Sequence, residues 1–142
     1  MISNEENKDG LYVLSISDTG VSHRIVGKPN QDSVAFVVEG QDFVIAISDG
    51  VGSCKHAEMG SRFAVDAVVK LFTEDVYKGR NAVEDLPNLI IDEWLNNIGE
   101  NNPDDYCATL KAAIKRGNQV MMISVGDGLL ALTSSGMQVI AP

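Results

Sequence analysis

Three aspartates stand beside short strand-like segments, where a side chain can be held firmly without lying in a core. Asp32 directly precedes one such segment, Asp49 follows the next, and Asp127 comes just after a third. Carboxylates at the ends of adjacent strands can converge, and uncompensated negative charges within a few ångströms raise one another's pKa. A hard divalent cation removes that cost, and oxygen-only ligation suits Mg²⁺ or Mn²⁺ better than zinc. The pattern therefore predicts a divalent metal site.

Glycine follows two of these aspartates, in the pairs Asp49-Gly50 and Asp127-Gly128. Gly50 allows a sharp turn and lets its carbonyl approach an ion, because no Cβ stands in the way. Each pair taken alone is more often only a turn, and the combination is more informative than its parts. The alternative is an unrelated α+β binding domain whose Asp-Gly turns are only turns, in which Asp32, Asp49 and Asp127 would lie far apart.

The segments around these residues predict an α+β domain. Strands are expected first, with residues 33–38 and 43–48 forming a hairpin, and an amphipathic helix follows over 57–72. A second helix is expected to begin at Pro87, a residue accepted in a first turn. The remaining strands are expected as an antiparallel meander, and the full set of strands comprises residues 11–17, 33–38, 43–48, 107–115, 120–125, 129–133 and 137–140. This order indicates helices packed on a largely antiparallel sheet.

Composition limits the possible partners. The chain has 142 residues with 11 Lys plus Arg and 20 Asp plus Glu, for a net charge of −9. Such a balance argues against nucleic-acid binding, which needs a basic face, and no apolar run is long enough for a membrane span. Residues 74–105 are strongly acidic, typical of a solvated helix surface, with a docking face for a basic partner as the alternative. Two cysteines without a CxxC pairing favour a reducing, cytoplasmic location.

Several short motifs together resemble one enzyme family. In chain order they are Gly27-Lys28-Pro29-Asn30-Gln31-Asp32-Ser33, Ile47-Ser48-Asp49-Gly50-Val51-Gly52-Ser53, Ala57-Glu58-Met59-Gly60-Ser61, Asp105-Tyr106-Cys107-Ala108-Thr109-Leu110 and Val125-Gly126-Asp127. This series resembles the metal-dependent serine/threonine protein phosphatases of the PP2C (PPM) family, in its compact bacterial branch. The likeness runs from about residue 15 to residue 140, and it implies an α-β-β-α sandwich of antiparallel sheets flanked by helices.

The resemblance also implies roles for individual residues. Asp49 matches the aspartate that bridges two catalytic Mg²⁺ or Mn²⁺ ions, and Gly50 matches the glycine whose carbonyl binds one of them. Asp32 matches the acidic residue that orients the attacking water, and Asp127 matches the aspartate linked to a third ion. The implied reaction is hydrolysis of phosphoserine and phosphothreonine in proteins, opposite a cognate Ser/Thr kinase.

Two basic residues are candidates for holding the substrate phosphate. Many family members place an arginine shortly before the acidic pair, whereas this chain has Lys28 there and Arg24 eight residues before Asp32. A lysine can bind phosphate as a point charge but lacks the bidentate fork of arginine. Gln31 stands where glutamate is often found, which removes one negative charge near the metal.

The end of the chain is the largest departure from the family. The last expected strand, 137–140, stops two residues before the C-terminus and would leave an open sheet edge. We expect residues 1–142 to form a single phosphatase domain that is incomplete at its C-terminus, without two further metal-binding aspartates. Weak metal binding and little activity follow, and a non-catalytic pseudophosphatase that binds a partner is the alternative function.

Overall fold

The computed structural model describes residues 2–8, 10–76, 82–134 and 137–141. Its helices are α1 (Val21–Ile25), α2 (Ala57–Thr73), α3 (Ala82–Ile98) and the short 3₁₀ helix η1 (Pro103–Tyr106). Its strands are β1 (Ile2–Lys8), β2 (Leu11–Ser17), β3 (Asp32–Glu39), β4 (Asp42–Asp49), β5 (Leu110–Arg116), β6 (Gln119–Val125), β7 (Leu130–Ser134) and β8 (Met137–Ala141). None of the helices in the described part of the chain is long and apolar enough to cross a membrane.

A four-stranded antiparallel sheet in the order β3-β4-β5-β6 forms the centre of the molecule. Its first two strands are the predicted hairpin, closed by a turn in which Gly40 has φ of 62°. That left-handed backbone is accessible to glycine without strain. Because β4 and β5 are paired although about sixty residues separate them, the sheet brings the first and last thirds of the chain together.

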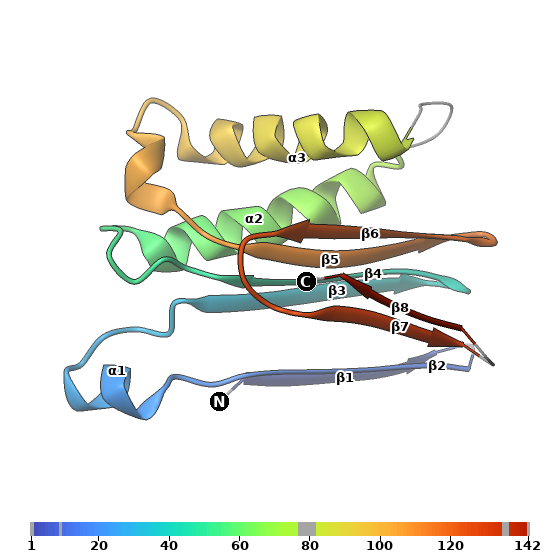
Figure 1. Cartoon of the computed structure of the whole chain (residues 1–142), viewed down its shortest axis with the longest axis horizontal. Helices are drawn as coiled ribbons and strands as arrows, with labels where there is room; N and C mark the ends of the chain where they lie inside the picture. Colours follow the sequence, from blue (N-terminus) through green and yellow to red (C-terminus); the bar gives the residue numbers. More distant parts are fainter. Residues whose placement is uncertain (1, 9, 77–81, 135–136, 142) are drawn as a thin grey trace.

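Helices α2 and α3 cover one face of this sheet (Figure 1). The core lies between them, and its fully buried side chains include Phe72, Val68 and Val65 from α2 and Ile114 from β5. Burying a side chain of this size contributes roughly 1.5–3 kcal/mol each. The apolar spacing in α2 therefore fixes which side of the helix faces the sheet.

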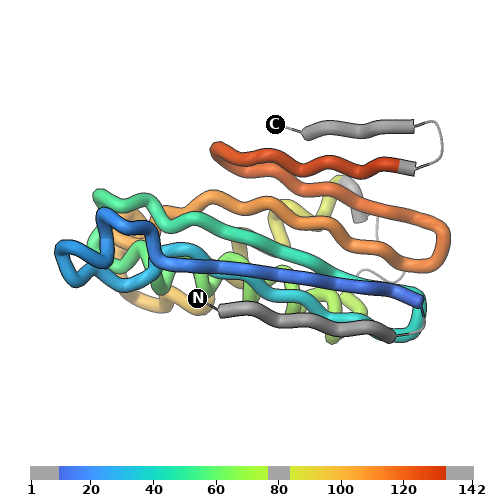
Figure 2. The backbone as a smooth tube through the Cα atoms, turned by 90° about the horizontal axis from the view of Figure 1, so that it is seen from below, coloured from blue at the N-terminus to red at the C-terminus, as the bar shows by residue number. Residues whose placement is uncertain are grey.

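Two separate hairpins, β1-β2 and β7-β8, lie on the side of the sheet opposite the helices (Figure 1). Figure 2 shows that β2 runs across the face of the sheet, whereas β7 lies beside the β6 edge. In β2, Val13, Ser15 and Ser17 are buried, whereas Tyr12 and Leu14 are exposed. This alternation shows that one side of β2 packs on the central sheet. The α+β class predicted from the sequence, with helices on an antiparallel sheet, is confirmed.

Several predicted boundaries were wrong. Helix α3 begins at Ala82, so Pro87 lies inside it and not in its first turn. The preceding turn is held in place because Leu86 is almost completely buried in the core. The strand expected from Cys107 begins at Leu110, because residues 103–106 form η1. The expected meander is divided, since β7 pairs with β8 in a sheet of its own.

Candidate metal centre

Asp32 and Asp49 face each other across the first hairpin. The two residues are cross-strand partners at the open end of the β3-β4 ladder. Burial raises the pKa of Asp32, and a hydrogen bond to Asp49 together with its negative charge raises that pKa further, while nearby His23 lowers it. The sheet thus holds two carboxyl groups in direct interaction, an arrangement that favours a bound cation.

A set of hydrogen bonds from Thr109 fixes the backbone at Asp49. The Thr109 hydroxyl accepts a hydrogen bond of 3.0 Å from the Asp49 amide, and the Thr109 amide donates to the Asp49 carbonyl at 2.8 Å. Ser48 also donates through its hydroxyl to the Thr109 carbonyl. The threonine of the Asp105–Leu110 motif therefore clamps the residue at the centre of the candidate site.

Gly50 follows in a position that excludes any side chain. A Cβ at this residue would lie 2.3 Å from the Ala57 carbonyl oxygen and 2.9 Å from that of Gln31. The Gly50 amide donates to the same Gln31 carbonyl at 3.0 Å. Glycine is thus required because the start of α2 and the segment before β3 close around the Asp49-Gly50 turn.

Gln31 was treated in the sequence only as a departure from glutamate, but it is a structural part of this turn. Its side chain is 7% exposed, and Oε1 is buried without a hydrogen-bond partner among the described residues. A Cβ at Gly52 would lie 3.5 Å from that oxygen. The Gln31 side chain therefore fills the space behind residues 50–52 without adding negative charge.

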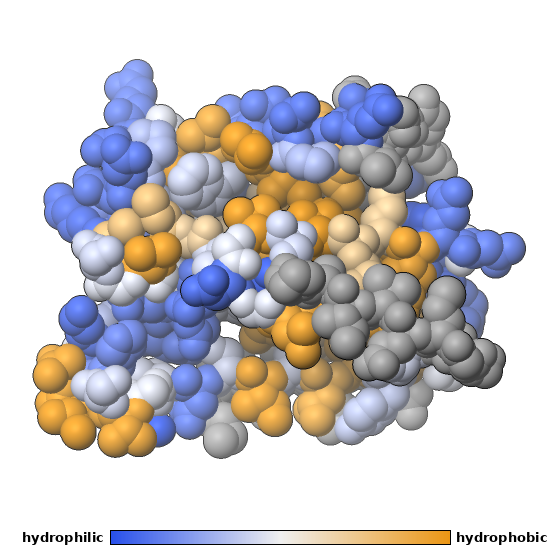
Figure 3. Space-filling model, in the orientation of Figure 1, coloured by the Kyte–Doolittle hydropathy of each residue, from blue (hydrophilic) through white to orange (hydrophobic). Residues whose placement is uncertain are grey.

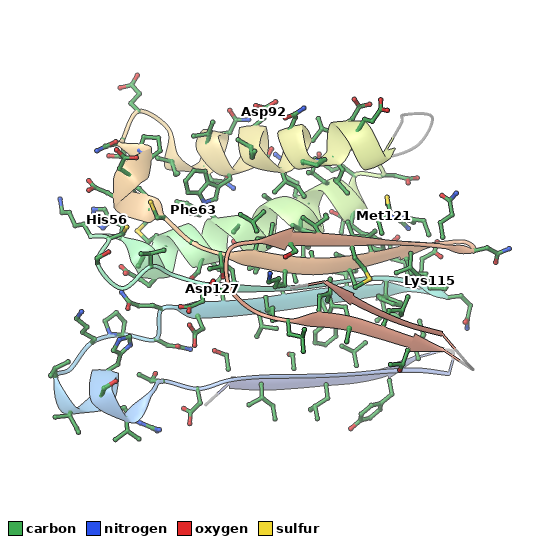
Figure 4. The ribbon with its side chains drawn as sticks, in the orientation of Figure 1. His56, Phe63, Asp92, Lys115, Met121 and Asp127 are labelled. Atoms are coloured by element: carbon green, nitrogen blue, oxygen red, sulfur yellow. The ribbon has the colours of Figure 1, made fainter. Side chains whose placement is uncertain are left out.

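All three predicted aspartates line one cavity of about 490 Å³, which we call the acidic cavity. It lies between the central sheet, the end of β2 and the loop after β6, and it also includes Asp18. Figure 3 shows a hollow between the hairpin layer and the rest of the molecule, and Figure 4 places Asp127 on the loop that leads from β6 to β7. Asp32, Asp49 and Asp127 are therefore not scattered over different faces.

Lys111 is a further residue of the acidic cavity, and the sequence analysis did not single it out. Its side chain comes from β5, is 2% exposed, and donates from Nζ to the Ser124 hydroxyl and, at 2.8 Å, to the Gly126 carbonyl. These bonds tie β5 to the turn that carries Asp127. The sequence offers one indication of this role, because a lysine between Leu110 and Ala112 in a strand is unusual for a buried position.

The two predicted phosphate-binding residues are not among the residues that line the acidic cavity. Arg24 lies on α1, has a side chain that is 56% exposed, and pairs with Asp18 at 3.5 Å. Lys28 is exposed, and its amide donates to the His23 carbonyl at 2.9 Å. Arg24 is thus connected to the cavity through Asp18, whereas Lys28 lies in the loop before β3.

The oxygen donors of the acidic cavity fit a hard divalent cation by chemistry, because carboxylates and carbonyls are the ligands of Mg²⁺ and Mn²⁺. The raised pKa of Asp32 is the structural sign of that fit, since a cation would offset the repulsion from Asp49. In the described part of the chain, no three His, Cys, Asp or Glu side chains are close enough together to form a metal-binding group. The carboxylates of Asp32 and Asp49 are thus the candidate ligands for which the structure shows a direct interaction.

Comparison with known protein families gives one match, to the family described as Protein phosphatase 2C, over residues 19–142. Neither the curated proteins nor the solved structures contain a match to the chain. The matched region includes Asp32, Asp49, Lys111 and Asp127 of the acidic cavity, whereas Asp18 lies just before it. Phosphatases of this family generally depend on Mg²⁺ or Mn²⁺. The match covers most of the sequence, and the chain therefore belongs to the protein phosphatase 2C family.

Proposed function

We propose that the protein is a metal-dependent phosphatase that removes phosphate from phosphoserine and phosphothreonine in other proteins. The observation that carries this proposal is the interacting pair Asp32 and Asp49 at the wall of the acidic cavity. The family match supports a phosphatase domain, and the exposed rim of the cavity gives a protein substrate access.

In this proposal Asp49 and the Gly50 carbonyl would hold Mg²⁺ or Mn²⁺, Asp32 would orient the attacking water, and Asp127 would bind a further ion. When bound, such ions lower the pKa of water toward neutrality and offset charge on phosphoryl oxygens. Thr109 keeps the Asp49 backbone in place, so the carboxylate does not have to reorganise when the substrate arrives. Arg24 and Lys28 are proposed to meet the substrate phosphate at the rim.

The test is hydrolysis of a phosphothreonine peptide in the presence of Mn²⁺, measured as released phosphate. We expect Asp49→Asn to reduce the rate at least roughly 100-fold, because the lost charge belongs to the ion-binding pair. Asp92→Asn is the matched control, since Asp92 is an exposed residue on the outer side of α3, and it should leave the rate unchanged (Figure 4). Equal rates for the two variants would contradict the proposal.

A non-catalytic pseudophosphatase is the second candidate. The absence of a three-residue metal-binding group among the described residues favours it. Calorimetry with Mn²⁺ separates the two functions, because a phosphatase must bind the ion through Asp49 and a pseudophosphatase need not. Binding that Asp49→Asn abolishes supports the enzyme, whereas a wild-type chain without any Mn²⁺ heat supports the binding module.

The proposed partners are phosphorylated proteins and, on the opposing side of the same cycle, a Ser/Thr kinase. We also propose a cytoplasmic location. It is supported by Cys54 and Cys107, which are both free thiols in the structure, because secreted domains usually pair their cysteines.

A further inference from the structure

Cys54 and Cys107 are 53 positions apart in the sequence, yet the fold brings their segments together. Residues 49–56 run beside residues 105–109, and three backbone contacts join the two segments. Thr109 donates to the Asp49 carbonyl at 2.8 Å, Val51 donates to the Cys107 carbonyl at 2.9 Å, and His56 donates to the Asp105 carbonyl at 2.8 Å. Cys54 thus lies between two residues that are both bonded to the segment that carries Cys107.

A local turn brings Cys54 back toward this segment. The Cys54 amide donates to the Val51 carbonyl at 2.8 Å, while the amide of the same Val51 is bonded to Cys107. The bonded backbones thus place both cysteines on adjoining segments. In agreement with this placement, a hydrogen bond with the Cys54 thiol raises the pKa of Cys107, with burial as the second cause. The Cys107 thiol also lies 3.4 Å from the Asp104 carbonyl oxygen.

Both side chains are accessible to a small reagent. Each cysteine is only partly buried, and neither is in a disulfide. We propose that Cys54 and Cys107 form an oxidation-sensitive pair that peroxide converts into an intramolecular disulfide next to the candidate metal centre. This inference goes beyond the proposed phosphatase function and does not depend on it.

The chemistry balances with hydrogen peroxide as the oxidant. One thiolate attacks a peroxide oxygen, breaking the O–O bond to give a sulfenic acid and hydroxide, which takes up the proton released by the thiol. The second thiol then attacks that sulfur, the S–O bond breaks, and a second water leaves as the S–S bond forms. Two thiols are oxidised and one peroxide is reduced to two waters.

The new bond would act on the residues that hold Asp49. It would join the turn after Gly50 to the segment immediately before Thr109, so that a covalent bond would reinforce the hydrogen bonds between Asp49 and Thr109. Closing a loop of this length reduces the entropy of the unfolded chain. We therefore expect the midpoint of thermal unfolding to rise by roughly 5–15 °C in the oxidised protein.

The experiment treats the reduced chain with hydrogen peroxide and follows free thiols with a chromogenic disulfide reagent. We expect both thiols to disappear without any dimer on a non-reducing gel, and mass spectrometry of a digest to find one peptide pair that joins Cys54 to Cys107. The matched control is the same chain unfolded in urea, in which the two thiols are no longer held together. The native chain should form the bond at least roughly 10-fold faster.

Two single-cysteine variants complete the test. Cys54→Ser and Cys107→Ser should each stop at a sulfenic acid that dimedone traps, and neither should gain thermal stability after peroxide. The proposal is overturned if the native chain closes the bond no faster than the unfolded one, or if its products are sulfinic acids or dimers. It is also overturned if the unfolding midpoint of the oxidised wild type does not exceed that of the reduced form.

Discussion

Replacement of Asp32 by asparagine removes one negative charge from the Asp32–Asp49 pair while it keeps the size and shape of the side chain. Asparagine has nearly the same size as aspartate but stays neutral. In the wild type, burial and the facing Asp49 carboxyl raise the pKa of Asp32. At neutral pH the two negative charges therefore repel each other and lower the free energy of unfolding. Asp32→Asn should therefore stabilise the metal-free protein and weaken its response to Mn²⁺.

The size of the first effect follows from Coulomb's law. Two unit charges about 4 Å apart interact by about 1 kcal/mol in water, and salt screens exposed groups such as Asp32 and Asp49 further. We expect Asp32→Asn to raise the free energy of unfolding by about 0.5–1 kcal/mol, or the unfolding midpoint by about 2–4 °C. A cation at 100 times its dissociation constant stabilises the wild type by about 2.7 kcal/mol, and the variant should lose most of that gain.

The sign of the pH dependence follows from the direction of the shift. Because folding raises the pKa of Asp32 above its ordinary value of 3.8, the neutral form is favoured in the folded protein. The stability contributed by protonated Asp32 is fully present below about pH 3.8 and is lost as the pH rises through the raised pKa. The advantage of the Asp32→Asn variant should therefore appear over that window and vanish in stronger acid.

Thermal unfolding in EDTA and in MnCl₂, repeated from pH 3 to pH 7 (roughly the range over which carboxyls titrate), measures both effects. Asp92→Asn serves as the control on the outer side of α3 and should behave as the wild type does in every buffer. The reasoning is refuted if Asp32→Asn lowers the stability of the metal-free protein at pH 7. It is equally refuted if Mn²⁺ stabilises this variant as much as it stabilises the wild type.

Three further substitutions test, by urea unfolding, the packing of the candidate site and of the core beneath it. Lys111→Met leaves the two oxygens bound by Nζ without a donor and should cost about 1–3 kcal/mol, more than Lys115→Met, because the Lys115 side chain is only partly buried and water can replace its bond to the Gln41 carbonyl. Gly60→Ala places a Cβ 1.8 Å from the Tyr106 carbonyl oxygen and should cost about 1–3 kcal/mol; unchanged stability would contradict this contact. Phe72→Ala empties a fully buried position and should cost about 3–5 kcal/mol, whereas a loss below about 1 kcal/mol would be inconsistent with its burial.

The elements with strong periodicity could be predicted from the sequence. The β3-β4 hairpin and α2 are found within one or two residues of their expected bounds, because their apolar side chains form the core. Strand β1 was not predicted, since Ile2–Lys8 is polar and is held by backbone pairing with β2. The start of α3 was also missed, because burial of Leu86 outweighs the preference of Pro87 for a first turn.

The site was predictable where a residue type carries its own chemistry. Asp32, Asp49 and Asp127 could be selected because three aspartates at the ends of strand-like segments, two of them followed by glycine, are more informative together than any one of them alone. Lys111 could not be selected, since its role depends on the pairing of β5 with β6, which places its ammonium beside the Gly126 carbonyl. A single sequence does not contain that long-range register, so the place of Lys111 in the acidic cavity became visible only in the fold.

The charge balance of the acidic cavity explains why the proposed reaction requires metal ions. The three predicted aspartates line the cavity together with Asp18, which Arg24 pairs at 3.5 Å. Among the described residues that line it, Lys111 is the one basic residue. The Lys111 ammonium is already bonded to oxygens of the β6 strand and the following turn, and its burial keeps it from moving toward a ligand. A phosphate group that entered this cavity alone would be repelled by the carboxylates. Bound divalent ions would make the electrostatic potential of the cavity favourable for phosphate. The described side chains that line it offer no cation other than the already bonded Lys111, so the electrostatics of the cavity support the metal dependence of the proposed function.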